Sequence, residues 1–302
     1  MVPVDGDRIK AVGATKEAAM TGEQLAVTHD EHTAPVGAWD AIAAGYDRHV
    51  TPTEVPLANE ALSLAGLKPG HHFLDVAAGT GGLSLPAARL GAKVLATDWS
   101  PAMIECFEAR VSAEGISEAQ GRVMDAHALE LEDGTFNVTG SQFGVMLVPD
   151  QPLALREMVR VTKPGGRLLV IAYGSPTGIE FLHFFIGALK SVVPDFAGLP
   201  DDPPPLEFQA SDPAVLRQRL SDAGLKDIRV EASAERIEFR SGQEMWDWVL
   251  HSNPISGMLT ADLTHEQQAT MRQVLDGMLR ERSNDNGIAV LTSPVNIGIG
   301  TK

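Results

Sequence analysis

The chain of 302 residues is poor in cysteine, in basic side chains and in long apolar runs. Its single cysteine, Cys106, excludes an internal disulfide and fits the reducing cytoplasm that we expect for it. Basic residues number 24 against 40 acidic ones, and the net charge of −16 disfavours binding to nucleic-acid phosphates. No apolar run approaches the ~20 residues of a membrane span, and the first residues lack the basic and apolar regions of a signal peptide.

Sequence motifs for metal and nucleophilic catalysis are also lacking. The nine histidines are scattered, and none is paired with Cys or Glu at a helical spacing, so we expect no metal site. Neither a G-x-S-x-G nucleophile elbow nor a Walker loop occurs.

A glycine-rich stretch organises the chain. Residues 73–77 read as a buried strand, a turn with three glycines follows, and a helix is expected over residues 83–90. A second strand over residues 93–97 ends at Asp98, about 20 residues past the glycines, where a carboxylate is placed to hydrogen-bond ribose hydroxyls. The unit is therefore predicted to bind an adenosine-type cofactor.

Two departures from the dinucleotide fingerprint G-x-G-x-x-G indicate which cofactor this is. Ser84 stands at the third glycine position, and Asp75 precedes the turn, where a carboxylate repels a pyrophosphate but suits an ammonium group. The run from Asp75 to Gly81, Asp-Val-Ala-Ala-Gly-Thr-Gly, resembles the D/E-x-G-x-G-x-G motif of class I S-adenosylmethionine-dependent methyltransferases. Ala77 replaces the first glycine of that motif.

The resemblance extends over about residues 39–173 and is strongest with the ubiquinone- and menaquinone-type and natural-product branch. It includes a Trp-to-Tyr-Asp segment ahead of the glycines and the run from Leu155 to Gly166. It implies S-adenosylmethionine as cofactor and the following cofactor-binding residues: Tyr46, Asp75, Ala77, Gly79, Thr80, Gly81, Asp98, Trp99, Met103, Asp125, Ala126, Ser141 and Gln142.

Strand and helix alternate five times, which predicts an α/β fold with a parallel sheet and helices on both faces. A sixth strand is expected over residues 227–239 and a seventh over 294–300. The resemblance implies a Rossmann-like, doubly wound sheet of seven strands whose last strand is antiparallel. We expect residues 1–34 to be flexible and residues 35–302 to form one domain, with a core over about residues 67–174.

Two inserted segments, residues 175–211 and 242–287, follow the predicted fifth and sixth strands and are expected to form a helical lid over the substrate. Two helices are predicted within the second insert. Packing of the inserts on each other, or a subunit interface in a homodimer, is the alternative role. The large apolar groups expected to line the substrate pocket are Phe143, Phe181, Phe185 and Trp246.

The predicted reaction is transfer of a methyl group from S-adenosylmethionine to a small aromatic or apolar acceptor, on oxygen, nitrogen or ring carbon. In-line displacement from an activated donor needs mainly positioning, and a general base only where the acceptor is protonated. His49, His183 and His251 are the base candidates, whereas His127 is expected in a solvated loop. Two alternatives stay open: an NAD-type oxidoreductase on a Rossmann-like fold, and a non-catalytic S-adenosylmethionine-binding protein.

Overall fold

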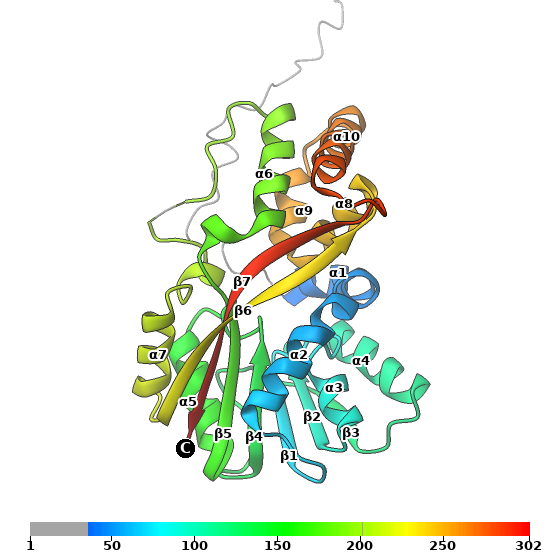
Figure 1. Cartoon of the computed structure of the whole chain (residues 1–302). Coiled ribbons are helices and arrows are strands. Elements are labelled where there is room, and N and C mark those ends of the chain that lie inside the picture. The colour runs from blue at the N-terminus through cyan, green and yellow to red at the C-terminus, as the bar shows by residue number, and fades with distance from the viewer. Residues whose placement is uncertain (1–35, 201) are drawn as a thin grey trace, which may run out of the picture.

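A seven-stranded sheet runs through the part of the chain that the computed structural model describes, residues 36–200 and 202–302 (Figure 1). The strand order is β3-β2-β1-β4-β5-β7-β6, and β7 runs in the direction opposite to the other six strands. This confirms the predicted fold class; the segment predicted to be flexible, residues 1–34, lies outside the described residues. The strands are β1 His72–Val76, β2 Lys93–Asp98, β3 Ala119–Val123, β4 Phe136–Gln142, β5 Thr162–Tyr173, β6 Lys226–Phe239 and β7 Ala289–Thr301.

Helices cover both faces of the sheet, because consecutive residues of the central strands, whose side chains point to opposite faces, are buried. Phe73 and Leu169 pack with α2 on one face, and Leu74 and Leu168 pack with α5 and α7 on the other. The helices are α1 Val36–His49, α2 Thr51–Ala65, α3 Ser84–Arg89, α4 Pro101–Ala113, α5 Gln151–Val161, α6 Glu180–Val192, α7 Pro213–Asp222, α8 Gly242–Ser252, α9 Pro254–Thr260 and α10 His265–Arg282.

Strands β6 and β7 pair with each other beyond the point where β5 ends. β6 pairs with β7 as far as Phe239 opposite Ala289, whereas β5 stops at Tyr173 opposite Val295. The prediction that the seventh strand begins at Pro294 was therefore wrong, because the residues before it pair with β6 alone. The two ends form a two-stranded ribbon that rises beyond the sheet towards α8 and α10 (Figure 1).

The inserted helices pack around a second apolar core, apart from the cores on the sheet. Its centre includes Phe185, Trp248, Met271 and Leu275, contributed by α6, α8 and α10. Together with α9 and the ribbon, these helices cover the carboxyl ends of the strands as the predicted lid (Figure 1). The second insert holds three helices instead of two, because Asn253 caps a separate α9, its side chain accepting from the backbone N–H of Ile255. No helix in the described residues is long and apolar enough to span a membrane.

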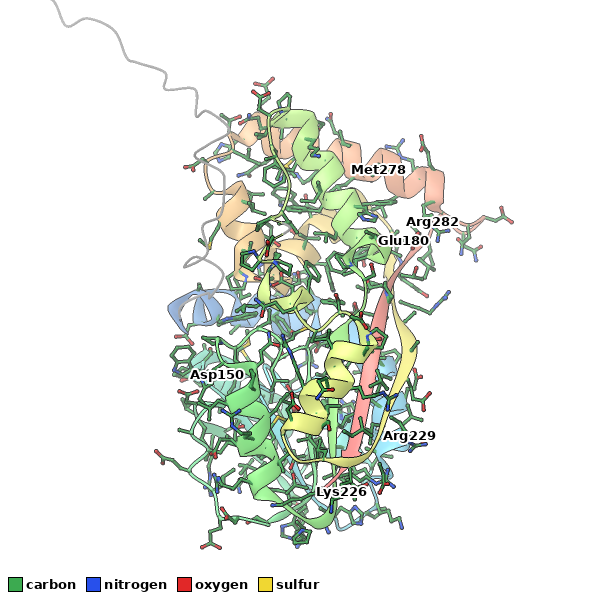
Figure 2. The ribbon with its side chains drawn as sticks, turned by 90° about the vertical axis from the view of Figure 1, so that its left-hand side faces the viewer. Asp150, Glu180, Lys226, Arg229, Met278 and Arg282 are labelled. Carbon is green, nitrogen blue, oxygen red and sulfur yellow. The ribbon has the colours of Figure 1, made fainter. Side chains whose placement is uncertain are left out.

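Glu180 joins the lid to the ribbon (Figure 2). Its Oε2 accepts hydrogen bonds from the backbone N–H of Thr292, at 2.7 Å, and from the Thr292 hydroxyl, at 2.9 Å. Its Oε1 lies 3.2 Å from the Arg282 guanidinium at the end of α10. Burial of Glu180 acts to raise the pKa of its carboxyl, but these three donors together lower it.

Substitution Glu180→Ala should lower the free energy of unfolding by about 1 to 3 kcal/mol, because charge-assisted hydrogen bonds are lost and a partly buried backbone N–H loses its acceptor. Urea unfolding checks this. Glu238→Ala, at an exposed position on β6, should change stability by less than about 0.5 kcal/mol. Equal losses in the two variants would contradict the anchoring role.

Candidate functional site

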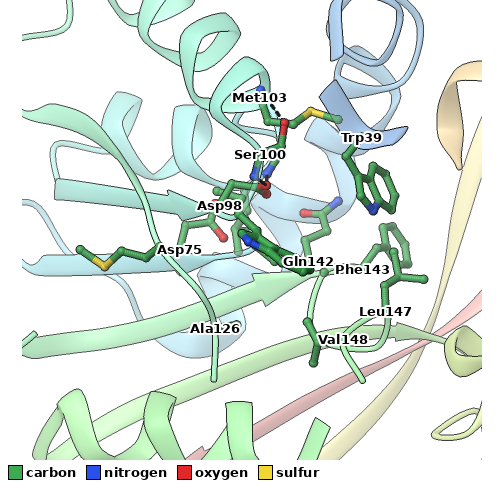
Figure 3. A pocket seen from close by; sticks show the side chains of 18 of the residues that line it. Trp39, Asp75, Asp98, Ser100, Met103, Ala126, Gln142, Phe143, Leu147 and Val148 are labelled. Atoms are coloured by element: carbon green, nitrogen blue, oxygen red, sulfur yellow. Dashed lines mark hydrogen bonds between the residues drawn. The ribbon is translucent and has the colours of Figure 1, made fainter. Parts of the chain in front are cut away.

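A cavity opens at the carboxyl ends of β1, β2 and β4, where the chain turns to opposite sides of β1 (Figure 3). Such a switch point is the usual ligand site of an open α/β sheet. Ten of the predicted cofactor-binding residues line it: Tyr46, Asp75, Ala77, Gly79, Asp98, Trp99, Met103, Asp125, Ala126 and Gln142.

The glycine-rich loop is shaped by close approaches that only glycine allows. A Cβ on Gly81 would lie 2.5 Å from the Phe107 ring, and one on Gly82 would lie 2.0 Å from a carboxyl oxygen of Glu54. Ala77, where the motif has glycine, keeps a left-handed backbone with φ of 54°. Such a conformation costs an L-residue roughly 1 kcal/mol or more, so the loop geometry is imposed by its surroundings.

Three predicted cofactor contacts lie outside the cavity lining. Thr80 is buried and its hydroxyl pairs with that of Thr51 on α2. Gly81 faces Phe107, and the Ser141 hydroxyl accepts from the backbone N–H of Val145, at 3.0 Å. These three residues hold the loops that form the cavity and are not among the residues that line it; their contact with a cofactor stays a prediction.

Asp75 presents an unused acceptor to the cavity. The residue is 1% exposed, and its Oδ2 accepts from the Ser84 hydroxyl at 2.6 Å. Its Oδ1 is buried without any hydrogen-bond partner in the described residues, as is the Oε1 of Gln142 nearby. Burial raises the pKa of the Asp75 carboxyl to about 8. A buried acceptor without a donor is costly, so these atoms indicate a ligand that donates hydrogen bonds.

Asp98 lies at the end of β2, close to Asp75 (Figure 3). Its Oδ2 accepts from the backbone N–H of Gly79 at 2.8 Å, and its Oδ1 accepts from that of Ser100 at 2.9 Å. Burial raises the pKa of Asp98 although these backbone donors act against the rise. Each carboxylate oxygen keeps one lone pair for a ligand hydroxyl.

Asp125 and His127 follow β3 and form one wall of the cavity. Asp125 Oδ1 lies 2.9 Å from the backbone N of His127 and 2.7 Å from its Nδ1. His127 Nε2 accepts from the backbone N–H of Asp150, so the neutral ring carries its proton on Nδ1 and donates it to Asp125. The expectation of a solvated His127 was therefore wrong: it lines the cavity and orients Asp125.

Helix α1 covers the cavity because two side chains tie it to α4. Asp40 accepts from the Ser100 hydroxyl and from the backbone N–H of Ala102, at the start of α4. Nearer the end of α1, Asp47 pairs with the guanidinium of Arg110 on α4. These ties hold Trp39 and Tyr46, both on α1, over the mouth.

A second cavity adjoins the first and lies under the lid. Phe181 and Phe185 of α6 line it, as predicted for the substrate pocket. Phe143, also predicted, has a left-handed backbone with φ of 56° and stacks on Tyr173 at 4.6 Å between ring centroids. The residues that line both cavities are Trp39, Tyr46, Glu54, Phe143 and Leu147.

Trp246, also predicted for the substrate pocket, lines neither cavity. Its side chain is buried in the lid, where the Arg272 guanidinium lies 5.5 Å above its ring. Trp248, two residues further along α8, lines the second cavity and donates from Nε1 to the Thr53 hydroxyl. Positions two apart on a helix point about 200° apart, so only one of the two tryptophans can face the cavity.

The three histidines expected as base candidates line neither cavity. His49 and His251 stack on each other, with 5.4 Å between ring centroids, and His251 lies against the backbone of Gly45. His183 is exposed on α6. The described residues hold no group of three or more His, Cys, Asp or Glu side chains placed to bind a metal ion.

Glu54, which could not be identified from the sequence, is the carboxyl group that lines both cavities. It is 4% exposed and accepts from the Tyr46 hydroxyl at 2.6 Å. Burial raises the pKa of its carboxyl to about 7, although the hydrogen bond from Tyr46 acts to lower it. An acidic residue in the first turn of a helix is ordinarily a surface group, so the sequence carries little signal for this position.

Comparison with known proteins agrees with this geometry. Residues 58–200 match the model of the ubiE/COQ5 methyltransferase family. A demethylmenaquinone methyltransferase of Mycobacterium tuberculosis is 32% identical over 204 residues, which cover 63% of this chain and 83% of that protein. This chain belongs to the ubiE/COQ5 methyltransferase family.

Further matches include one more relative and two solved structures. An uncharacterised protein of Mycobacterium tuberculosis is 37% identical over 185 residues, 61% of this chain; the match spans 65% of that relative's length. A putative methyltransferase from Bacillus halodurans has a TM-score of 0.53 at 18% identity, over 81% of this chain and 98% of the other. One from Haloferax volcanii has a TM-score of 0.54 at 17% identity, over 87% and 96%. The two structures share the fold.

Asp75 should make the ligand-free protein less stable as pH rises. Its pKa is about 8 when folded and near 3.8 when unfolded, so the folded state binds the proton more tightly, and stability falls between these values as pH increases. Asp75→Asn cannot ionise and still accepts from Ser84. Thermal unfolding at pH 5, 7 and 9 should show the variant gaining on the natural protein as pH rises. A stability difference that does not change with pH would contradict this.

Proposed function

We propose that this protein transfers a methyl group from S-adenosylmethionine to a small acceptor with an aromatic or apolar body. The observation that carries the proposal is the unpartnered, buried Oδ1 of Asp75 beside the glycine-rich loop. A cationic ammonium group is the donor that such a carboxylate suits, and S-adenosylmethionine has one. Membership of the ubiE/COQ5 methyltransferase family supports the same activity.

The residues of the first cavity fit the parts of this cofactor. Asp75 would hold the ammonium group, and Asp98 would accept from the ribose hydroxyls. Asp125, oriented by His127, would accept from the exocyclic amine of adenine, with Trp99 and Met103 beside the ring. When bound, the cofactor supplies a methyl group already activated by its sulfonium.

The work left to the protein is positioning and proton transfer at the boundary between the cavities. Phe143, Leu147 and Tyr46 line both cavities, so they can fix the line of approach and exclude water. Glu54 is placed at the same boundary, and its pKa of about 7 lets it accept a proton from an acceptor that is protonated near neutral pH. We propose Glu54, in place of the three histidines, as the general base where one is needed.

The two alternative functions are less well supported. An NAD-type oxidoreductase would place a pyrophosphate beside Asp75, which repels it, and family membership favours the methyltransferase. A non-catalytic cofactor-binding protein would show the same first cavity, so turnover on an acceptor is the observation that separates it.

Calorimetry tests the cofactor assignment. S-adenosylhomocysteine and S-adenosylmethionine should bind, and NAD should bind more weakly than either. Asp98→Ala should weaken S-adenosylhomocysteine binding by roughly 10- to 100-fold, because charge-assisted hydrogen bonds worth about 1.5 to 3 kcal/mol are lost together with the Gly79 contact.

The control for this variant is Glu105→Ala, an exposed acid on α4, which should leave the affinity unchanged. Tighter binding of NAD would overturn the cofactor assignment. Equal affinities of the two variants would mean that Asp98 is not a cofactor contact.

Phe181 tests the acceptor pocket. It lies in the second cavity, edge-on to Trp248 at 4.9 Å between ring centroids. Phe181→Ala should lower kcat/KM for an acceptor found by methylation screening by roughly tenfold, equivalent to about 1.4 kcal/mol of lost aromatic contact, with S-adenosylhomocysteine affinity unchanged. Phe184→Ala, on the same helix but outside both cavities, is the control. Unchanged kinetics for both variants would place the acceptor elsewhere.

A further inference from the structure

Three carboxyl groups line the second cavity, and no cation balances them. Glu54 is 4% exposed and Glu235 is 2% exposed, while Glu207 is half-buried with its Oε2 fully buried and unpartnered. Within residues 36–200 and 202–302, no Lys, Arg or His lines this cavity, and none of the three acids forms an ion pair.

The three acids come from separate parts of the chain and converge on one point. Glu54 lies on α2, Glu207 on the short helix Leu206–Phe208, and Glu235 on β6. All three raise the pKa of the Tyr173 hydroxyl, after the larger effect of its burial, and that hydroxyl lies 3.5 Å from Glu235 Oε2. Their meeting is a property of the fold, because no acidic stretch of sequence brings them together.

Glu235 occupies a position where a strand normally places an apolar side chain. Along the ribbon, Glu235, Ile237 and Phe239 are buried and Arg236 and Glu238 are exposed, so Glu235 points into the lid with its apolar neighbours. Its one hydrogen-bond partner, the Tyr173 hydroxyl, is at the limit of bonding distance. A nearly unpartnered carboxyl buried in this way costs stability, and a ligand that pairs with it would recover that loss.

The remaining walls suit a cation as well. Tyr46, Tyr173, Phe181 and Trp248 line the cavity, and faces of aromatic rings attract cations. Three carboxyl groups exclude an anionic acceptor by repulsion, whereas a protonated amine can satisfy both the carboxylates and the rings. The sequence alone predicted only an aromatic or apolar acceptor, because these inward-facing acids cannot be recognised before the fold is known.

We propose that the methyl acceptor carries a protonated amine, bound between Glu207 and Glu235 in the second cavity, on an aromatic or apolar body. The inference rests on the proposed function and narrows it to acceptors with a basic nitrogen. Glu207 and Glu235 recognise this nitrogen, whether the methyl group is transferred to it or to another atom of the acceptor. The alternative is that the carboxyl groups stay protonated and donate hydrogen bonds to a carbonyl oxygen. In that case a neutral ketone should bind more tightly than the amine.

Calorimetry with matched small probes decides between these readings. Phenethylamine should bind the protein, with S-adenosylhomocysteine present, at least ~10-fold more tightly than phenethyl alcohol or the ketone benzylacetone. The anion hydrocinnamate should not bind. Glu207→Gln and Glu235→Gln should each remove most of the preference for the amine and leave S-adenosylhomocysteine affinity unchanged, which also shows that the variants are folded.

The control is Glu231→Gln, at an outward-facing, exposed position on β6, which should keep the preference. Binding of the ketone or the alcohol as tightly as the amine, undetectable binding of the amine, or retention of its preference in both cavity variants would each overturn the inference. A protein that binds S-adenosylhomocysteine but shows no amine preference overturns this inference alone. One that prefers the amine but binds no S-adenosylhomocysteine overturns the proposed function instead.

Discussion

Burial of carboxyl groups without counter-ions dominates the end of the sheet where the cavities lie. Asp75, Glu54 and Glu235 are each at most 4% exposed, and burial raises their pKa values to about 8, 7 and 8. Each has a hydroxyl as its hydrogen-bond partner: Ser84, Tyr46 and Tyr173 respectively. A hydroxyl can donate to a carboxylate or accept from a carboxylic acid, so each pair tolerates both charge states. A proton on each carboxyl group can therefore remove the charge at this end of the sheet without breaking these hydrogen bonds.

This arrangement couples the two cavities. Glu54 lines both, and its charge raises the pKa of Asp75 and that of Glu235. Ionisation of Glu54 therefore makes ionisation of Asp75 on one side and of Glu235 on the other less favourable.

The sequence predicted the parts of the site that follow from the order of the strands. Asp75 and Asp98 end successive parallel strands, and such ends converge at one edge of the sheet, so their proximity followed from the alternation of strand and helix. The lid was less predictable, because which side of each inserted element faces inward depends on how the inserts pack. Trp246 was predicted to line the pocket, but Trp248 lines the second cavity instead. Glu235 lies on β6, where polar residues occur on both faces of the strand, so the sequence does not show which face is buried.

Much of the second cavity is formed by residues outside the stretch that matches the family model. Residues 58–200, which match the family model, hold the glycine-rich loop and the strand ends around the first cavity. Glu207, Glu235 and Trp248 come later in the chain. Glu235 lies on the ribbon, in the part of β6 and β7 that is not paired with β5. Substitutions in the ribbon and the lid can therefore alter the second cavity without disturbing the hydrogen-bond ladder that supports the glycine-rich loop. Divergence among relatives is expected to concentrate in the ribbon and the lid.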